Sequence, residues 1–188
     1  KSNNFSIPLI HKKSNSSSCM IYSHGNATDL YDLEDMLTYL HNNLNIDVIG
    51  YDYVGYGFTQ KFLNSYPSEY SCTQNLADIV KYANNHDYDN IILMGSSLGT
   101  GVTLNYVKHN NGFHGKVILE SPFTSICSVV SPYLYNFSVD MFGNYDNIDH
   151  IHHPMLIIHG MNDEVVPFDH GVMLFDKHKK LMRKKKKV

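Results

Sequence analysis

Short apolar segments alternate along the chain with longer segments in which apolar residues recur every three or four positions. The apolar segments are residues 19–22, 46–51, 91–94, 116–119 and 155–159. They have the length of strands, and the last two are almost wholly apolar, as expected for strands that helices cover on both faces. We therefore expect these segments to be the buried strands of a mostly parallel sheet.

The longer segments have the periodicity of amphipathic helices. The first carries leucines at spacings of three and four, with Thr28 or Asp29 available as N-cap: Leu30, Leu33, Leu37, Leu40 and Leu44. Further helices are predicted near residues 72–83, 98–108 and 168–180. Repeated strand, loop and helix order favours a doubly wound α/β fold, in which sites gather at the carboxyl ends of the strands.

Length and composition indicate one domain, residues 1–188, because 188 residues of which 43% are hydrophobic can form one sizeable core. The formal net charge of -3 gives no general attraction to nucleic acid. The basic residues crowd into residues 177–188, a tail or insertion. This tail could bind an anionic membrane, although a low-complexity insertion or a chain break explains it better.

The three cysteines, Cys19, Cys72 and Cys127, are far apart and predict neither a disulfide framework nor a zinc site. A reducing, cytoplasmic location fits this usage, with any membrane anchor in segments outside the chain. No apolar run reaches the roughly 18 to 20 residues that cross a bilayer. The histidines of segment 150–153 are expected to be solvated and not to bind zinc, so we expect no metal and no cofactor.

Ser97 is the candidate nucleophile, in the segment Gly95-Ser96-Ser97-Leu98-Gly99. A G-x-S-x-G spacing between a strand and a helix places the central serine on a sharp, strained turn, and the two glycines leave room for it. The helix N-terminus then favours developing negative charge. The competing interpretation is a glycine-rich turn that binds phosphate or only redirects the chain.

An oxyanion hole for such a serine needs two backbone N–H donors. Leu98, the residue after the nucleophile, supplies one, and Asn26, in the loop after the strand 19–22, is the expected second. His24 and Gly25 would support that loop, and His24 would hold it in place, not act as the base. A simple turn fixed by glycine is the alternative for residues 24–27.

Asp163 is the candidate acid that would orient a histidine, because it follows the late strand 155–159 in the chain order serine then aspartate. Glu120 is a weaker alternative, and Asp163 could also simply cap its turn. No histidine after Asp163 lies in a convincing position for the base. His170 is the nearest alternative, but it belongs to the predicted helix 168–180.

Several motifs together resemble the alpha/beta-hydrolase domain-containing protein 17 group of the Bem46-like branch. They are HGNATDL at 24–30, YDYVGYG at 51–57, PSE at 67–69, GSSLG at 95–99, SPFTS at 121–125 and HGMNDEVV at 159–166. The resemblance implies an α/β-hydrolase fold with a small lid, lacking its last strand and helix. It also implies a catalytic histidine outside these residues, and Asp52 as a hydrogen-bonding anchor.

The resemblance further implies serine esterase or thioesterase activity, since that group contains enzymes that remove palmitate from proteins. The expected substrate is an acyl-protein or a lipid ester, with peripheral membrane contact and an unknown oligomeric state. A lipid or small-ester carboxylesterase and a non-catalytic membrane-associated scaffold are the alternatives. An acyl chain could lie along the lid aromatics, which could instead only cover the sheet edge: Tyr133, Tyr135, Phe137, Phe142 and Tyr145.

Overall fold

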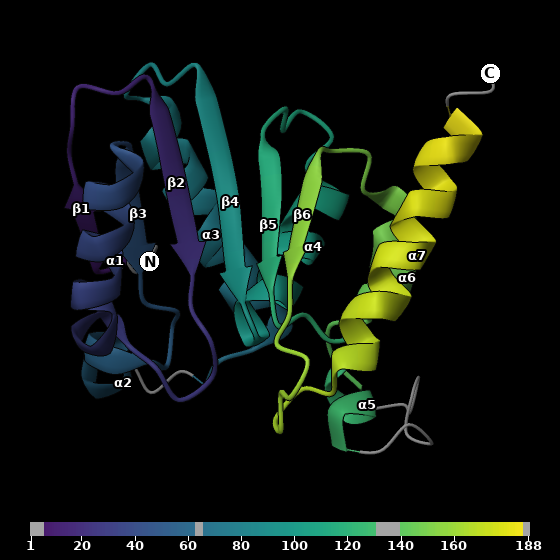
Figure 1. Ribbon diagram of the computed structural model, residues 1–188. Coiled ribbons are helices and arrows are strands. Elements are labelled where there is room, and N and C mark those ends of the chain that lie inside the picture. Colours follow the sequence, from purple (N-terminus) through teal and green to yellow (C-terminus); the bar gives the residue numbers. More distant parts are fainter. Residues whose placement is uncertain (1–5, 63–65, 131–139, 186–188) are drawn as a thin grey trace.

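The computed structural model describes residues 6–62, 66–130 and 140–185, which form a six-stranded sheet with helices on both faces (Figure 1). The strand order is β1-β3-β2-β4-β5-β6, and only β1 runs antiparallel to its neighbour. The strands are β1 (Leu9–Lys12), β2 (Ser18–Ser23), β3 (Asp47–Tyr51), β4 (Asn90–Ser96), β5 (Lys116–Glu120) and β6 (Met155–Ile158). The mostly parallel α/β architecture expected from the sequence is confirmed.

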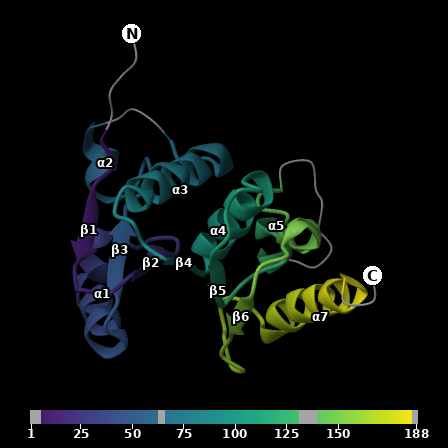
Figure 2. The same ribbon diagram turned by 90° about the horizontal axis from the view of Figure 1, so that it is seen from above.

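The long helices lie on opposite faces of this sheet (Figure 2). Helix α1 (Leu30–Leu44) covers one face, and α3 (Glu69–Asn84) and α4 (Leu98–His109) cover the other. Helix α7 (Phe168–Lys185) packs against β6 and against the short segments α6 (Asn144–Asn147) and η2 (Ile148–His150). Two further short helices, α2 (Gly57–Phe62) and α5 (Ile126–Val130), lie near the carboxyl ends of the strands.

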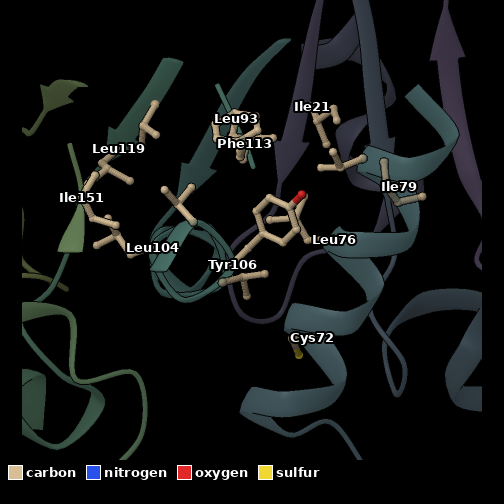
Figure 3. Close-up of a cluster of buried hydrophobic side chains, with 14 of the residues drawn as sticks. Ile21, Cys72, Leu76, Ile79, Leu93, Leu104, Tyr106, Phe113, Leu119 and Ile151 are labelled. Atoms are coloured by element: carbon tan, nitrogen blue, oxygen red, sulfur yellow. The ribbon is translucent and has the colours of Figure 1, made fainter. Parts of the chain in front are cut away.

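The larger core fills the space between the sheet and helices α3 and α4 (Figure 3). Ile21, Leu93 and Leu119 of the strands are fully buried there, and they share this cluster with Leu76 of α3 and Leu104 of α4. A smaller cluster joins the other face of the sheet to the leucines of α1. Because helices cover both faces of β2 and β3, successive residues of these strands are buried. The expectation that segment 155–159 is buried on both faces is wrong: β6 lies at the sheet edge, and Leu156 and Ile158 on one of its faces are 52% and 46% exposed.

The structure adds elements that the sequence pattern did not predict. Strand β1 pairs with β3 at the sheet edge, and its four residues are only partly buried. Helices α5 and α6 are too short for a helical period to be recognised. Helix α7 continues to Lys185, so the basic residues from Lys177 onward start within a regular helix. Among the described helices, none is both long and apolar enough to cross a membrane.

Candidate active site

Ser97 lies between β4 and α4 in a backbone conformation that side chains rarely adopt. Its φ is 47° and its ψ is -114°. Its N–H donates to the carbonyl of Glu120 at the end of β5 (2.9 Å), and its own carbonyl accepts from the N–H of Thr100 (2.9 Å). The Ser97 side chain makes no capping hydrogen bond to α4. The turn is therefore held by backbone bonds, and the hydroxyl is not used to hold it.

Gly95 and Gly99 allow this turn because other backbone atoms fill the space that a side chain would need. A Cβ on Gly95 would lie 2.3 Å from the Gly99 carbonyl oxygen, and a Cβ on Gly99 would lie 1.9 Å from the Ser23 carbonyl oxygen. Both distances are far inside van der Waals contact. The glycines of the G-x-S-x-G segment are thus required by the close approach of β4, α4 and the end of β2.

The loop after β2 comes close to Ser97. A Cβ on Gly25 would lie 3.6 Å from the Ser97 Cβ, and the next residue, Asn26, is exposed. Leu98 is the first residue of α4, so its N–H is among those that lack a partner within the helix. The structure therefore brings together the two segments from which the oxyanion donors were expected, the 24–27 loop and the start of α4.

Two tyrosines from the loop after β3 hold the 24–27 loop. The Tyr53 hydroxyl donates to the His24 carbonyl (2.9 Å), and the Tyr56 hydroxyl donates to Asn26 Oδ1 (2.8 Å). The His24 ring also packs against the Tyr53 ring, with centroids 4.2 Å apart. The YDYVGYG motif therefore supports the loop directly, which the sequence could not show because the contacts join separate loops.

His24 is fully buried, and burial lowers its pKa, so its ring is neutral near pH 7. Its Nδ1 bonds to the Gly25 carbonyl (2.7 Å), and its Nε2 lies 3.9 Å from Asp52 Oδ1. That Asp52 oxygen accepts the N–H of Leu30, the first residue of α1 (2.9 Å). Burial raises the pKa of Asp52. These contacts are those of a histidine that holds a loop and of an aspartate that anchors a helix.

Asp163 lies in the loop after β6, with its carboxylate held by backbone donors. Oδ1 accepts the N–H groups of Val165 and Val166, each at 2.9 Å. Burial alone would raise the pKa of Asp163, but these bonds, with the Ser121 hydroxyl and His159, lower it. The side chain is 17% exposed, so an ionised carboxylate remains accessible from the carboxyl edge of the sheet.

His159 is a residue of this region that the sequence reasoning missed. Its buried Nε2 bonds to the Val166 carbonyl (2.8 Å) and lies 3.6 Å from Asp163 Oδ2. His159 thus contacts both the acid and the loop that carries the acid. Its position at the end of the last apolar segment, four residues before Asp163, was the available signal.

The remaining candidates have other contacts. The Glu120 carbonyl accepts the Ser97 N–H, while its side chain interacts with Tyr22. His170 is buried in α7, and its Nδ1 accepts the N–H of Thr124 (3.2 Å) and bonds to the Thr124 hydroxyl (2.9 Å). This ring nitrogen is therefore committed to Thr124.

The metal and lid candidates have these positions. His150 and His152 are exposed, as expected, but His153 is partly buried and its Nε2 bonds to the Phe113 carbonyl (2.7 Å), so the expectation of a solvated ring is wrong for this residue. Within the described ranges no three side chains are grouped as metal ligands. Phe142 is buried, and its ring packs against Gly101 of α4. Tyr145 is only partly buried against the core. The other lid aromatics, Tyr133, Tyr135 and Phe137, lie outside the described residues.

Comparison with known protein families shows which family this chain belongs to. The family described as serine aminopeptidase, S33, matches residues 14–145, well over half of the chain. The chain belongs to this α/β-hydrolase family. The match includes the Ser97 turn and the 24–27 loop, whereas Asp163 lies beyond it. The chain therefore belongs to a family of hydrolases, and its fold is the fold of that family.

The relatives of this chain include members of the alpha/beta-hydrolase domain-containing protein 17 group. The chain is 32% identical over 183 residues to protein 17B of Homo sapiens, covering 94% of this chain and 61% of that protein. It is 38% identical over 160 residues to an alpha/beta hydrolase of Acanthamoeba polyphaga mimivirus, covering 84% of this chain and 59% of the relative. The chain thus spans about three fifths of the length of these relatives.

Solved structures confirm the α/β-hydrolase fold of this chain. A monoacylglycerol lipase from Paleococcus ferrophilus superposes with a TM-score of 0.69 at 14% identity, covering 93% of this chain and 85% of that one. Est1E from Butyrivibrio proteoclasticus, solved with ferulic acid, gives the same TM-score at 17% identity, covering 92% and 83%. At such identities the likeness concerns the fold alone.

Proposed function

We propose that this hydrolase cleaves acyl ester or thioester bonds with Ser97 as nucleophile. The observation that carries the proposal is the backbone of Ser97, whose φ of 47° is combined with a side chain that makes no capping bond. A strained serine at a strand-to-helix turn, with its hydroxyl uncommitted, is the arrangement of the nucleophile in α/β-hydrolases. A turn that only redirected the chain would have no need of this strain at a non-glycine residue.

In the proposed reaction, the Ser97 oxygen attacks the acyl carbonyl carbon while a histidine accepts the hydroxyl proton. The N–H groups of Leu98 and Asn26 donate to the oxyanion that forms. The C–O or C–S bond to the leaving group then breaks, and the histidine returns the proton to the leaving oxygen or sulfur. Water hydrolyses the acyl-serine in the second half of the reaction. Asp163 orients the histidine, which we place outside these 188 residues.

A palmitoyl-protein is the substrate we favour, and the protein 17 resemblance supports it. Such substrates would be met at the cytoplasmic surface of a membrane. A monoacylglycerol or a small ester is the alternative, because the proposed residues act on the acyl carbonyl, which all these substrates share.

A fluorophosphonate probe on the purified full-length protein tests the nucleophile. We expect labelling of the unchanged protein and of Ser96→Ala, the matched neighbour, and no labelling of Ser97→Ala. Labelling that persists in Ser97→Ala would show that another residue is the nucleophile. Absence of labelling in the unchanged protein would favour a non-catalytic scaffold.

Substrate class is tested separately with a palmitoyl-thioester peptide, a monoacylglycerol and an aminoacyl anilide. The last of these probes the aminopeptidase activity that the family description names. We expect the highest kcat/KM on the thioester and loss of that activity in Ser97→Ala. Preference for the monoacylglycerol would select the lipase alternative, and preference for the anilide would refute the acyl-ester proposal.

A further inference from the structure

A cavity of about 540 Å³ lies between α5, Tyr145 of α6 and the first turns of α7. This volume lies within the range of small-ligand sites, roughly 300–1,000 Å³. One wall begins at Thr124, in the segment after β5, and the other at Pro167. Pro167 directly follows Val166, whose N–H binds the Asp163 carboxylate. The cavity therefore adjoins the loop that carries the candidate acid.

Three buried polar groups of the cavity wall bond to one another. The Thr124 hydroxyl bonds to the Ser128 hydroxyl (2.7 Å) and to His170 Nδ1 (2.9 Å). Burial lowers the pKa of His170, so this ring is neutral near pH 7. Because a buried polar group without a partner is costly, satisfied groups leave the wall suited to an apolar occupant.

Apolar side chains complete the wall. Val129 comes from α5, Tyr145 from α6, and Met173 from α7. Met173 is 48% exposed at the margin of the cavity, and its unbranched, flexible side chain can adapt to occupants of different shape. The one acidic residue of the lining, Asp169, is itself exposed to solvent.

The order of the strands sets the direction in which a substrate would lie. The 24–27 loop follows β2, on one side of β4, whereas the cavity is built from segments after β5 and β6, on the other side. The N–H of Ser97 bonds to the end of β5, so the nucleophile turn contacts the strand that leads into the cavity wall. A carbonyl with its oxygen toward Asn26 and Leu98 can thus extend its acyl chain toward β5 and β6.

We propose that this cavity binds the acyl chain of the substrate, so that the α5 and α7 side chains determine which chain lengths are cleaved. The proposal rests on the proposed function, since it assigns the acyl half of an ester or thioester to this cavity. Val129 and Met173 are then specificity-determining residues, and the leaving group stays outside the cavity.

The first test compares Val129→Trp, which fills the cavity, with Val130→Trp, the adjacent valine, which is 80% exposed. The substrates are p-nitrophenyl acetate and p-nitrophenyl octanoate. We expect Val129→Trp to lower the octanoate-to-acetate ratio of kcat/KM at least about tenfold, with acetate cleavage retained, because an acyl pocket discriminates by about this factor per methylene. Val130→Trp should keep the original ratio. An unchanged ratio in Val129→Trp, or an equal fall in both variants, would overturn the proposal.

The second test does not require activity. The chain contains no tryptophan, so in the Ser97→Ala protein Met173→Trp supplies a reporter at the cavity and Val172→Trp a matched reporter beside it. We expect 16-bromohexadecanoate to quench Met173→Trp saturably and Val172→Trp weakly. Equal quenching of both, or none, would reject the cavity as the acyl site. Quenching of Met173→Trp, together with no esterase activity in the protein that retains Ser97, would instead show that the acyl site exists and that the hydrolytic function fails.

Discussion

Individual residues at the site are constrained by backbone contacts more than by side-chain chemistry. Gly99 lies against the Ser23 carbonyl. Ser97, between β4 and Gly99, has a backbone φ in the left-handed region. Tyr53 and Tyr56 add hydrogen bonds that hold the 24–27 loop. The geometry of Ser97 and of the proposed oxyanion donors therefore depends on residues that would take no part in the chemistry.

Gly99→Ala should destabilise the fold by about 3 kcal/mol, because its Cβ would overlap a backbone oxygen that cannot move away without displacing β2. The free energy of urea unfolding measures this loss. Gly112→Ala is the control, since a Cβ there meets no atom within 4 Å. Equal stability of the two variants would contradict the close approach of α4 and β2.

Tyr56→Phe should lower kcat about tenfold with little change in KM. Without its hydroxyl bond, the Asn26 side chain and the N–H beside it lose their fixed position, and loss of a whole oxyanion donor costs about 100-fold or more. Ester hydrolysis kinetics measure this split, with the exposed Tyr70→Phe as control. A rise in KM at constant kcat would indicate substrate binding and not positioning.

At the scale of elements, a buried polar cluster joins the edge strand to the rest of the sheet. His11 of β1 bonds through Nε2 to Asp47 Oδ2 of β3 (3.1 Å), and the Tyr88 hydroxyl donates to the same oxygen. The other oxygen of Asp47 accepts from the N–H and hydroxyl of Ser14. This cluster lies near the start of β3, at the opposite end of that strand from Asp52 and the site.

The stability of this edge should depend on acid pH. Burial would raise the pKa of Asp47, but the bonds from Tyr88, Ser14 and His11 lower it to about 2, below its ordinary 3.8. A lowered aspartate pKa stabilises the fold above pH 3.8, and this contribution disappears as the pH falls toward 2. Burial also lowers the pKa of His11 below 6.5. As the pH falls below 6.5, the histidine is therefore protonated in the unfolded chain before it is protonated in the folded protein, and this adds a second loss of stability.

Asp47→Asn should therefore cost about 2 kcal/mol at pH 7 and flatten the pH dependence of unfolding between pH 4 and 2. Urea unfolding at a series of pH values measures both effects. Asp35→Asn, on the exposed side of α1, is the control and should change neither. A parallel pH profile for Asp47→Asn and the unchanged protein would show that Asp47 is not the group responsible.

Across the whole molecule, helix α7 carries its last basic residues away from the site, whereas Lys177 lies over the Tyr145 ring beside the cavity (3.9 Å). The helix starts at the carboxyl edge of the sheet beside the cavity and ends toward the opposite edge (Figure 1). Its 18 residues span about 27 Å, which exceeds the Debye length of about 8 Å at physiological salt. The charges at the end of α7 are therefore screened by salt from the groups at its start, beside the cavity.

Reversing the charges of Lys180, Arg183 and Lys184 to glutamate should change kcat/KM on a soluble ester less than twofold, because these residues belong to the second half of α7, remote from its start at the carboxyl edge of the sheet. Steady-state hydrolysis at physiological salt measures it. The same variant tests the membrane interpretation of the basic tail, since anionic vesicle binding should weaken if these residues contact lipid. A large fall in soluble ester hydrolysis would contradict the separation of the two regions.

The sequence by itself determined the strands, the main helices and the Ser97 turn, because these depend on local periodicity and on glycine spacing. The apolar segments 19–22 and 91–94 lie within strands, segment 46–51 starts one residue before β3, and Leu30, Leu33 and Leu37 are buried on one face of α1. Side-chain burial with period 3.6 or 2 leaves a signal in neighbouring residues. Tertiary contacts leave no such signal.

Only the tertiary structure decided which loops meet. It placed Tyr53 and Tyr56 against the 24–27 loop and His159 against Asp163, and it formed the cavity between α5 and α7. It also paired β1 with β3, because a partly buried edge strand has too weak an alternation to be recognised alone. Apart from the local contact between His159 and Asp163, these features arise from contacts between residues distant in the chain, which the order of strands across the sheet brings together.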